Sequence, residues 1–162
     1  MYYIYMDKIK IAVSQAKNFF NTADHLAYVT YPLLKDNKLF VVVINNLYMS
    51  MLKGMDAVFY TERLNKRIDF VPYDVDSRIA VFEKEIAPRL RVDIKIFKTI
   101  KDLKFIVEQH RESPVEFSRM NKFVICNHDY SVVKTVDIEI VKSYILNVRS
   151  FLHFVMEFAD NV

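Results

Sequence analysis

Arg149 and His153 form the pair of side chains in this sequence whose types and spacing could support a reaction. In a helix, residues i and i+4 lie on one face, so both side chains could reach the same phosphate group. An arginine can hold that phosphate, and an imidazole that titrates near neutral pH can transfer a proton. The pair therefore indicates metal-independent RNA cleavage. The alternative is a surface arginine that packs over a partly exposed histidine.

A second group of polar side chains lies within or beside apolar helical stripes. Its members are a histidine, two amides and a carboxylate: His25, Asn45, Asn46 and Asp56. They could line a polar pocket for a small ligand between two helices. They could equally form a buried hydrogen-bond network that fixes the register of those helices.

The segment 110–119 concentrates charge and gives a third candidate. His110, Arg111 and Arg119 bracket Glu112 and Glu116. The three basic side chains could bind an anion, or they could pair with the acidic side chains of their own segment. The middle third of the chain, residues 84–122, has 10 basic and 6 acidic residues, an excess of 4 positive charges. That bias is too small to predict a nucleic-acid surface by itself.

Composition argues against cofactor and metal sites of the common kinds. With one glycine in 162 residues, the chain cannot build the glycine-rich loops that cradle phosphates or dinucleotides. None of the four histidines lies at a metal-ligand spacing from another, and the single cysteine, Cys126, cannot form an internal disulfide. We therefore expect no metal, no cofactor and a reducing, cytoplasmic setting. The longest apolar run, Leu39 to Ile44, is too short to cross a membrane, and we find no signal peptide.

Two long helices must position the polar residues. Apolar side chains recur at three- and four-residue steps from Asp7 to about Pro32, and again from Asp36 to about Arg67. The short link at residues 34–36 makes them an antiparallel pair, with Asp36 as the expected cap of the second. The second helix is apolar on nearly all sides, so it should be buried on more than one. Residues 1–6 read as an aromatic extension that packs on the body or on another subunit.

The rest of the chain predicts three more helices and a hairpin. Asp74 or Asp76 should begin a third helix that ends near Leu90, Asp93 a fourth, and Asp137 the last. Residues 111–121, with Pro114, read as a loop. Residues 122–126 and 131–136 read as the two strands of a hairpin. We thus predict a single mainly α domain over residues 1–162, an up-and-down bundle of about five helices with one short β-hairpin before the last helix.

The helical pair HLAYVTYPLLKDNKLFVVVINNLYMSMLKGMDAVFYTERL resembles the HEPN superfamily of helical bundles. The chain is also similar to archaeal proteins of this length without an assigned function. The resemblance implies a dimerising bundle with nucleic-acid or nucleotide-related roles. HEPN ribonucleases carry an arginine and a histidine at a longer spacing than the match here, where three residues separate Arg149 from His153.

Three classes of function follow from these observations. The first is a non-catalytic interaction or regulatory module, a homodimer built on the first two helices, because a large exposed apolar surface usually marks an interface. The second is a HEPN-like protein that binds or cleaves RNA. The third is a helical bundle that binds a small ligand near His25 and Asn46.

Overall fold

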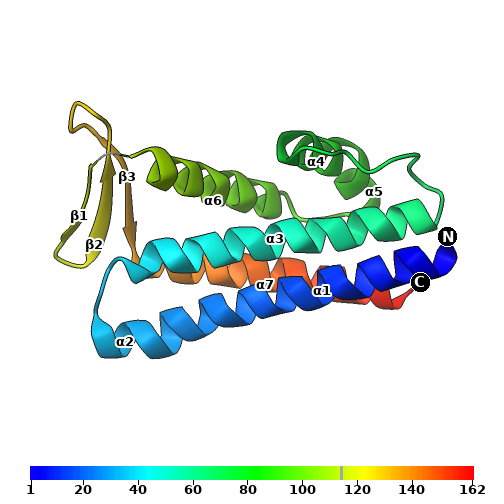
Figure 1. Cartoon of the computed structure of the whole chain (residues 1–162), viewed down its shortest axis with the longest axis horizontal. Coiled ribbons are helices and arrows are strands. Elements are labelled where there is room, and N and C mark those ends of the chain that lie inside the picture. Colours follow the sequence, from blue (N-terminus) through cyan, green and yellow to red (C-terminus); the bar gives the residue numbers. More distant parts are fainter. Residues whose placement is uncertain (114) are drawn as a thin grey trace.

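The protein is a mainly α bundle with a small antiparallel sheet at one end (Figure 1). A computed structural model describes residues 1–113 and 115–162; Pro114, which the sequence places in a loop, lies outside the described residues. The described part contains five helical runs and three strands, and the strands precede the last helix. The predicted fold class is confirmed.

The first helical run begins earlier and ends later than the sequence indicates. α1 (Tyr2–His25) continues through a π-helical segment, Leu26–Thr30, into α2 (Tyr31–Leu34). The expected extension at residues 1–6 is therefore helical from Tyr2 onward. Pro32 does not stop the helix, because the wider π turn just before it accommodates the missing N–H and the proline ring. Lys35 then ends the run in the left-handed region, at φ 52°.

The central element is α3 (Leu39–Leu64), which packs against α1, α6 and α7. Burial on three sides explains why its sequence is apolar nearly all round, as expected. Its first residue lies after Lys38, whose N–H donates to the Asp36 carboxylate at 3.0 Å. Asp36 thus shapes the turn before the helix instead of capping it directly. The antiparallel pairing of α1 with α3 is confirmed.

The third helical run repeats the arrangement of the first. α4 (Val75–Val81) leads into a second π-helical segment, Phe82–Ile86, and then into α5 (Ala87–Leu90). Pro88 again follows the π turn, and Arg91 ends the run at φ 55°. The Asp74 carboxylate accepts a hydrogen bond from Ser77 N at 2.8 Å, so this cap is confirmed.

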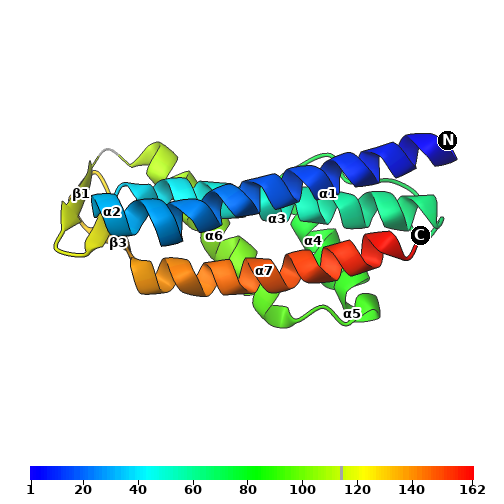
Figure 2. The ribbon, with the colours of Figure 1, turned by 90° about the horizontal axis from the view of Figure 1, so that it is seen from below.

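The last two helices also begin at the predicted caps. α6 (Ile94–Glu112) begins at Asp93, whose carboxylate accepts from Lys95 N at 2.9 Å. α7 (Ile138–Asp160) begins at Asp137, which accepts from Ile140 N at 2.9 Å. Seen from below, α7 runs alongside α1 and α3, and both chain termini lie at the end of the bundle opposite the sheet (Figure 2).

The sheet has one strand more than the predicted hairpin. β2 (Lys122–Cys126) pairs with β3 (Val132–Asp137) as expected, and β1 (Val115–Arg119) pairs antiparallel with β2 where we expected a loop. β1 has five residues and none of them is buried, so its sequence lacks the apolar run that predicted β2. Residues 123–126 of β2 are all buried, and of these Phe123 and Ile125 join the helical core together with Val136 of β3.

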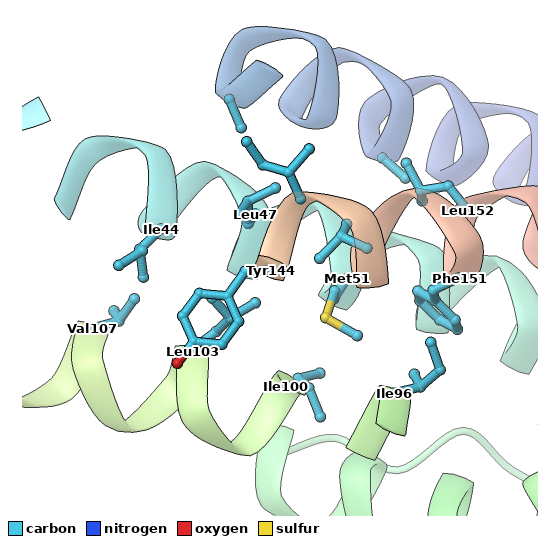
Figure 3. Packing of buried hydrophobic residues seen from close by; sticks show 14 of the residues in the cluster. Ile44, Leu47, Met51, Ile96, Ile100, Leu103, Val107, Tyr144, Phe151 and Leu152 are labelled. Carbon is cyan, nitrogen blue, oxygen red and sulfur yellow. The ribbon is translucent and has the colours of Figure 1, made fainter. Parts of the chain in front are cut away.

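The core lies between α3, α6 and α7 (Figure 3). Side chains of the three helices interdigitate there, and the labelled examples are Ile44, Leu47 and Met51 of α3, Ile96, Ile100, Leu103 and Val107 of α6, and Tyr144, Phe151 and Leu152 of α7. The only glycine, Gly54, is buried in α3 where that helix meets α7. The same cluster of buried residues includes side chains from every helical run described and from β2 and β3.

Candidate functional site

Arg149 of α7 lies against α1 and is already engaged there. Its Nη2 donates to the Asp24 carboxylate at 3.0 Å, and its guanidinium lies 5.5 Å from the centre of the Phe20 ring. His153, one turn further along α7, is exposed. The two side chains share a flank of α7, as the spacing predicts. The ion pair with Asp24 uses one of the donors that a scissile phosphate would need.

A groove of about 500 Å³ separates the first half of α1 from the C-terminal end of the chain. Its walls carry lysine, serine and asparagine side chains beside apolar ones, from Met6, Ile9, Lys10, Val13, Ser14, Lys17, Asn18 and Asn21 on one side and Ala159, Asp160 and Val162 on the other. Neither Arg149 nor His153 lines it. The groove and the predicted catalytic pair are therefore separate features, and RNA cleavage stays a prediction from the sequence.

The polar residues His25, Asn45, Asn46 and Asp56 do not share a site. His25 and Asn45 are exposed, and the amide of Asn46 donates to the Val42 carbonyl of its own helix at 2.8 Å. Asp56 is buried, and it lies about 16 Å further along α3 than Asn45, at 1.5 Å per residue. The prediction that all four residues form one pocket or one buried network is therefore wrong. Of the four, Asp56 is a buried carboxylate and the other three residues lie at or near the surface.

Asp56 holds the segment after α3 on the bundle. Its carboxylate accepts a hydrogen bond from Nη1 of Arg78 in α4, and Lys53 lies 3.9 Å from its other oxygen. Arg78 also donates from Nε to the Pro72 carbonyl at 2.6 Å. Burial raises the pKa of the Asp56 carboxyl, and the positive charges of Arg78 and Lys53 act in the opposite direction. This is a structural ion pair between α3 and α4.

In the charged segment 110–119, a basic side chain pairs with an acidic side chain of the same segment. Nδ1 of His110 lies 2.6 Å from a Glu116 carboxylate oxygen, which joins the end of α6 to β1. Arg111 and Arg119 are both exposed. Arg119 lines a hollow of about 540 Å³ on the outer face of the sheet, together with Phe117 and Lys122. His110 thus pairs with an acid of its own segment and Arg119 lines a hollow on the sheet, so the expected anion site made of all three basic residues is corrected to separate features.

Sequence reasoning missed a charged cluster at the C-terminal end of α3. The Glu62 side chain is 0% exposed, and its two carboxylate oxygens accept from Nη1 of Arg67, at 3.2 Å, and from Nη2 of Arg89. The short spacing of Glu62 and Arg67 is visible in the sequence, but Arg89 reaches the site only because α4 and α5 fold back over α3. No local pattern signals that contact.

Asn37 is a second residue that the sequence does not single out. It is buried in the turn between α2 and α3, and its Nδ2 donates to the carbonyls of Met120, at 2.9 Å, and Lys122, at 3.2 Å. Tyr31 donates a hydrogen bond to its Oδ1 at 3.4 Å. Asn37 therefore attaches the turn between two strands to the turn between two helices.

Within residues 1–113 and 115–162, no three histidine, cysteine or acidic side chains come together in a way that could hold a metal ion. Of the helices described, none has both the length and the apolar character that a bilayer crossing needs. Comparison with protein-family models and with curated protein sequences finds no match to this chain. The HEPN resemblance therefore stays a prediction.

Proposed function

We propose that this chain is a non-catalytic interaction module that acts as a homodimer through α1. The observation that carries the proposal is a stripe along the first helical run. Its members succeed one another at steps of three or four residues, and all are exposed: Ile4, Lys8, Ile11, Gln15, Asn18, Thr22, His25, Val29 and Leu33. Apolar residues of the inner face pack on α3, whereas the outer apolar side chains of the stripe face solvent.

The order of residues along the stripe favours a second copy as the occupant. The stripe has its apolar residues toward both ends, and its middle, from Gln15 to His25, is polar. If two copies meet antiparallel about a two-fold axis near Asn18, Ile4 of one copy faces Leu33 of the other, and Gln15 faces Thr22. Apolar ends then cover apolar ends, which is the self-complementarity that a two-fold interface requires.

Lys8 is the one charged residue of the stripe, and its ammonium group is directed elsewhere. It lies 5.4 Å from the centre of the Tyr5 ring and 5.6 Å from that of Tyr60 in the same chain. This leaves the aliphatic stem of Lys8 available to pack against an apolar partner residue. Val29 would be that residue in the antiparallel arrangement. The stripe therefore presents no unpaired charge to the second copy.

The length of the stripe fits a stable interface. From Ile4 to Leu33 it extends about 40 Å, and on a helix about 10 Å wide it presents roughly 400 Å² in projection. A standard interface buries about 800 Å² on each partner. The remaining area comes from two sources. The side chains project from the helix, so their contact area exceeds the projected area, and four more exposed side chains flank the two ends of the stripe: Tyr2, Tyr3, Tyr28 and Leu34.

Light scattering on wild type and two variants tests the proposal. We expect wild type to have twice the mass of one chain. Ile11→Glu should shift it to the mass of a single chain, because a buried glutamate at the interface has no partner. Leu146→Glu is the matched control, since Leu146 is 56% exposed on α7, close to the 57% of Ile11. It should stay dimeric.

Two results would contradict the proposal. One is a wild type that stays monomeric at micromolar concentration. The other is dissociation by Leu146→Glu to the same degree as by Ile11→Glu, which would place the contact on α7. A cytoplasmic setting belongs to the same proposal, because Cys126 is buried and free.

A further inference from the structure

Glu62, Arg67 and Arg89 form a cluster with two guanidinium groups on one carboxylate, which is one more than an ion pair requires. One fully buried carboxylate takes a guanidinium on each of its two oxygens. The arginine side chains themselves are 49% and 41% exposed. Glu62 therefore anchors both guanidinium groups from below while much of each side chain faces solvent.

The cluster has an uncompensated positive charge and unused donors. Two guanidinium groups and one carboxylate leave a net charge of +1. A guanidinium has five N–H donors, and the contacts with Glu62 occupy one nitrogen of each arginine. The other nitrogens of each fork remain available to a ligand. Paired arginines with free N–H groups are the usual partners of phosphate oxygens.

The backbone holds the two arginines in place before any ligand arrives. Arg67 N donates to the Glu62 carbonyl at 2.9 Å, directly after Lys66 turns the chain at φ 56°. Arg89 lies in α5, and Arg91 ends that helix with a similar left-handed residue. An arginine fixed in this way loses less side-chain entropy when it binds a ligand than a free surface lysine does.

The surroundings fit a small anion. Arg67, Arg89 and Leu90 line a shallow hollow of about 610 Å³. Within four residues along the chain lie three more basic side chains: Arg63, Lys66 and Arg91. The same stretches also hold three acids, Asp69, Glu85 and Asp93, so the net positive charge of the site comes from the two arginines that share Glu62. Among the described residues no aromatic side chain lines the hollow, so it offers a phosphate contact without a platform for a base.

We propose that Arg67 and Arg89, oriented by the buried Glu62, bind the terminal phosphate of a small phosphorylated molecule. The doubly charged phosphate group of a monoester has three terminal oxygens, so each guanidinium can reach one or two of them. This site is independent of the proposed dimer contact, because none of its residues belongs to the α1 stripe. Failure of one proposal leaves the other standing.

Calorimetric titration with inorganic phosphate tests the site, at an ionic strength held constant with chloride. A second arm uses glycerol phosphate, which separates binding of the free anion from binding of a phosphomonoester. We expect both to bind wild type. Arg67→Ala should weaken binding about tenfold or more, since it removes a charged hydrogen-bonding partner. Arg67→Lys should weaken it too, although it keeps the charge.

Arg91→Ala is the matched control, because it removes the same charge two residues from Arg89 without touching Glu62. It should change the affinity by less than about twofold, as expected of an exposed charge. The unfolding temperature of each unliganded variant shows whether the fold survives, and Arg67→Lys serves if Arg67→Ala is unstable. Absence of phosphate binding to wild type would overturn the proposal. An equal loss in Arg91→Ala would overturn it as well, because it would indicate diffuse charge attraction.

Discussion

Gly54→Ala should destabilise the protein, although the same change stabilises most helices. Gly54 lies in the interior of α3, where alanine is ordinarily favoured by about 1 kcal/mol. A Cβ at this position would lie 2.8 Å from Cε1 of Phe151, 3.4 Å from Val155 and 3.5 Å from Leu152, all on α7. The first distance is shorter than van der Waals contact allows, so α7 or the Phe151 ring must move.

Phe151 has little freedom to move. It is 1% exposed, its ring meets that of Phe82 edge-on at 6.0 Å, and it stacks on Phe154 at 6.3 Å. Overpacking of a core typically costs about 1–3 kcal/mol. After the gain in helix propensity of about 1 kcal/mol, we expect a net loss of about 0–2 kcal/mol, centred near 1 kcal/mol.

Urea denaturation followed by circular dichroism measures this difference. A double-mutant cycle with Phe151→Leu identifies its cause, because the smaller side chain makes room for the new methyl group. Gly54→Ala should cost less in the Phe151→Leu background than in wild type. A stabilisation of about 1 kcal/mol in wild type, as in an exposed helix, would refute the close approach of α3 and α7.

Two further changes probe other parts of the structure. Asn37→Ala should cost about 1–3 kcal/mol, because it leaves the carbonyls of Met120 and Lys122 without their donor; amide hydrogen exchange in β1 and β2 should also accelerate, and unchanged exchange there would contradict the role of Asn37. Burial, and secondarily the negative charge of Asp102, raises the pKa of Tyr144 to about 12 from its ordinary value of 10.0. The folded state thus resists ionisation of Tyr144, so its contribution to stability is full below pH 10 and is lost as the pH rises toward 12. Tyr144→Phe should flatten this alkaline loss in unfolding measurements, and a wild-type slope in the variant would contradict the assignment.

Local patterns in the sequence predict most of the fold because the physics behind them is local. The caps at Asp74, Asp93 and Asp137 depend on a side chain and an amide two or three residues away. The inward stripes of α1 and α3 depend on helical periodicity alone. By contrast, β1 becomes a strand through its pairing with β2: its five residues begin with an apolar–polar alternation, but none of them is buried, so the sequence carries no core signal there.

The candidate sites were harder to predict because contacts between distant segments decide them. The spacing of Arg149 and His153 places them on one flank of α7, but it cannot show that Asp24, 125 residues away, takes the guanidinium. The same holds for Asp56 with Arg78 and for Glu62 with Arg89. Each acid lies on a mostly apolar helix, and its partner arrives from another helix.

The ion pairs Asp56–Arg78 and Glu62–Arg89 show that the helices of the bundle are attached to α3 in different ways. Helices α1, α6 and α7 cover it with apolar side chains, whereas α4 and α5 also join it through buried carboxylates. A buried carboxylate that loses its partner costs more than the intact pair contributes, because the charge keeps its desolvation penalty. Arg89 therefore holds α5 on the bundle through the same contact that orients it toward the hollow. A phosphate bound there would draw on an arginine whose position the fold already requires, so binding needs little rearrangement of the chain.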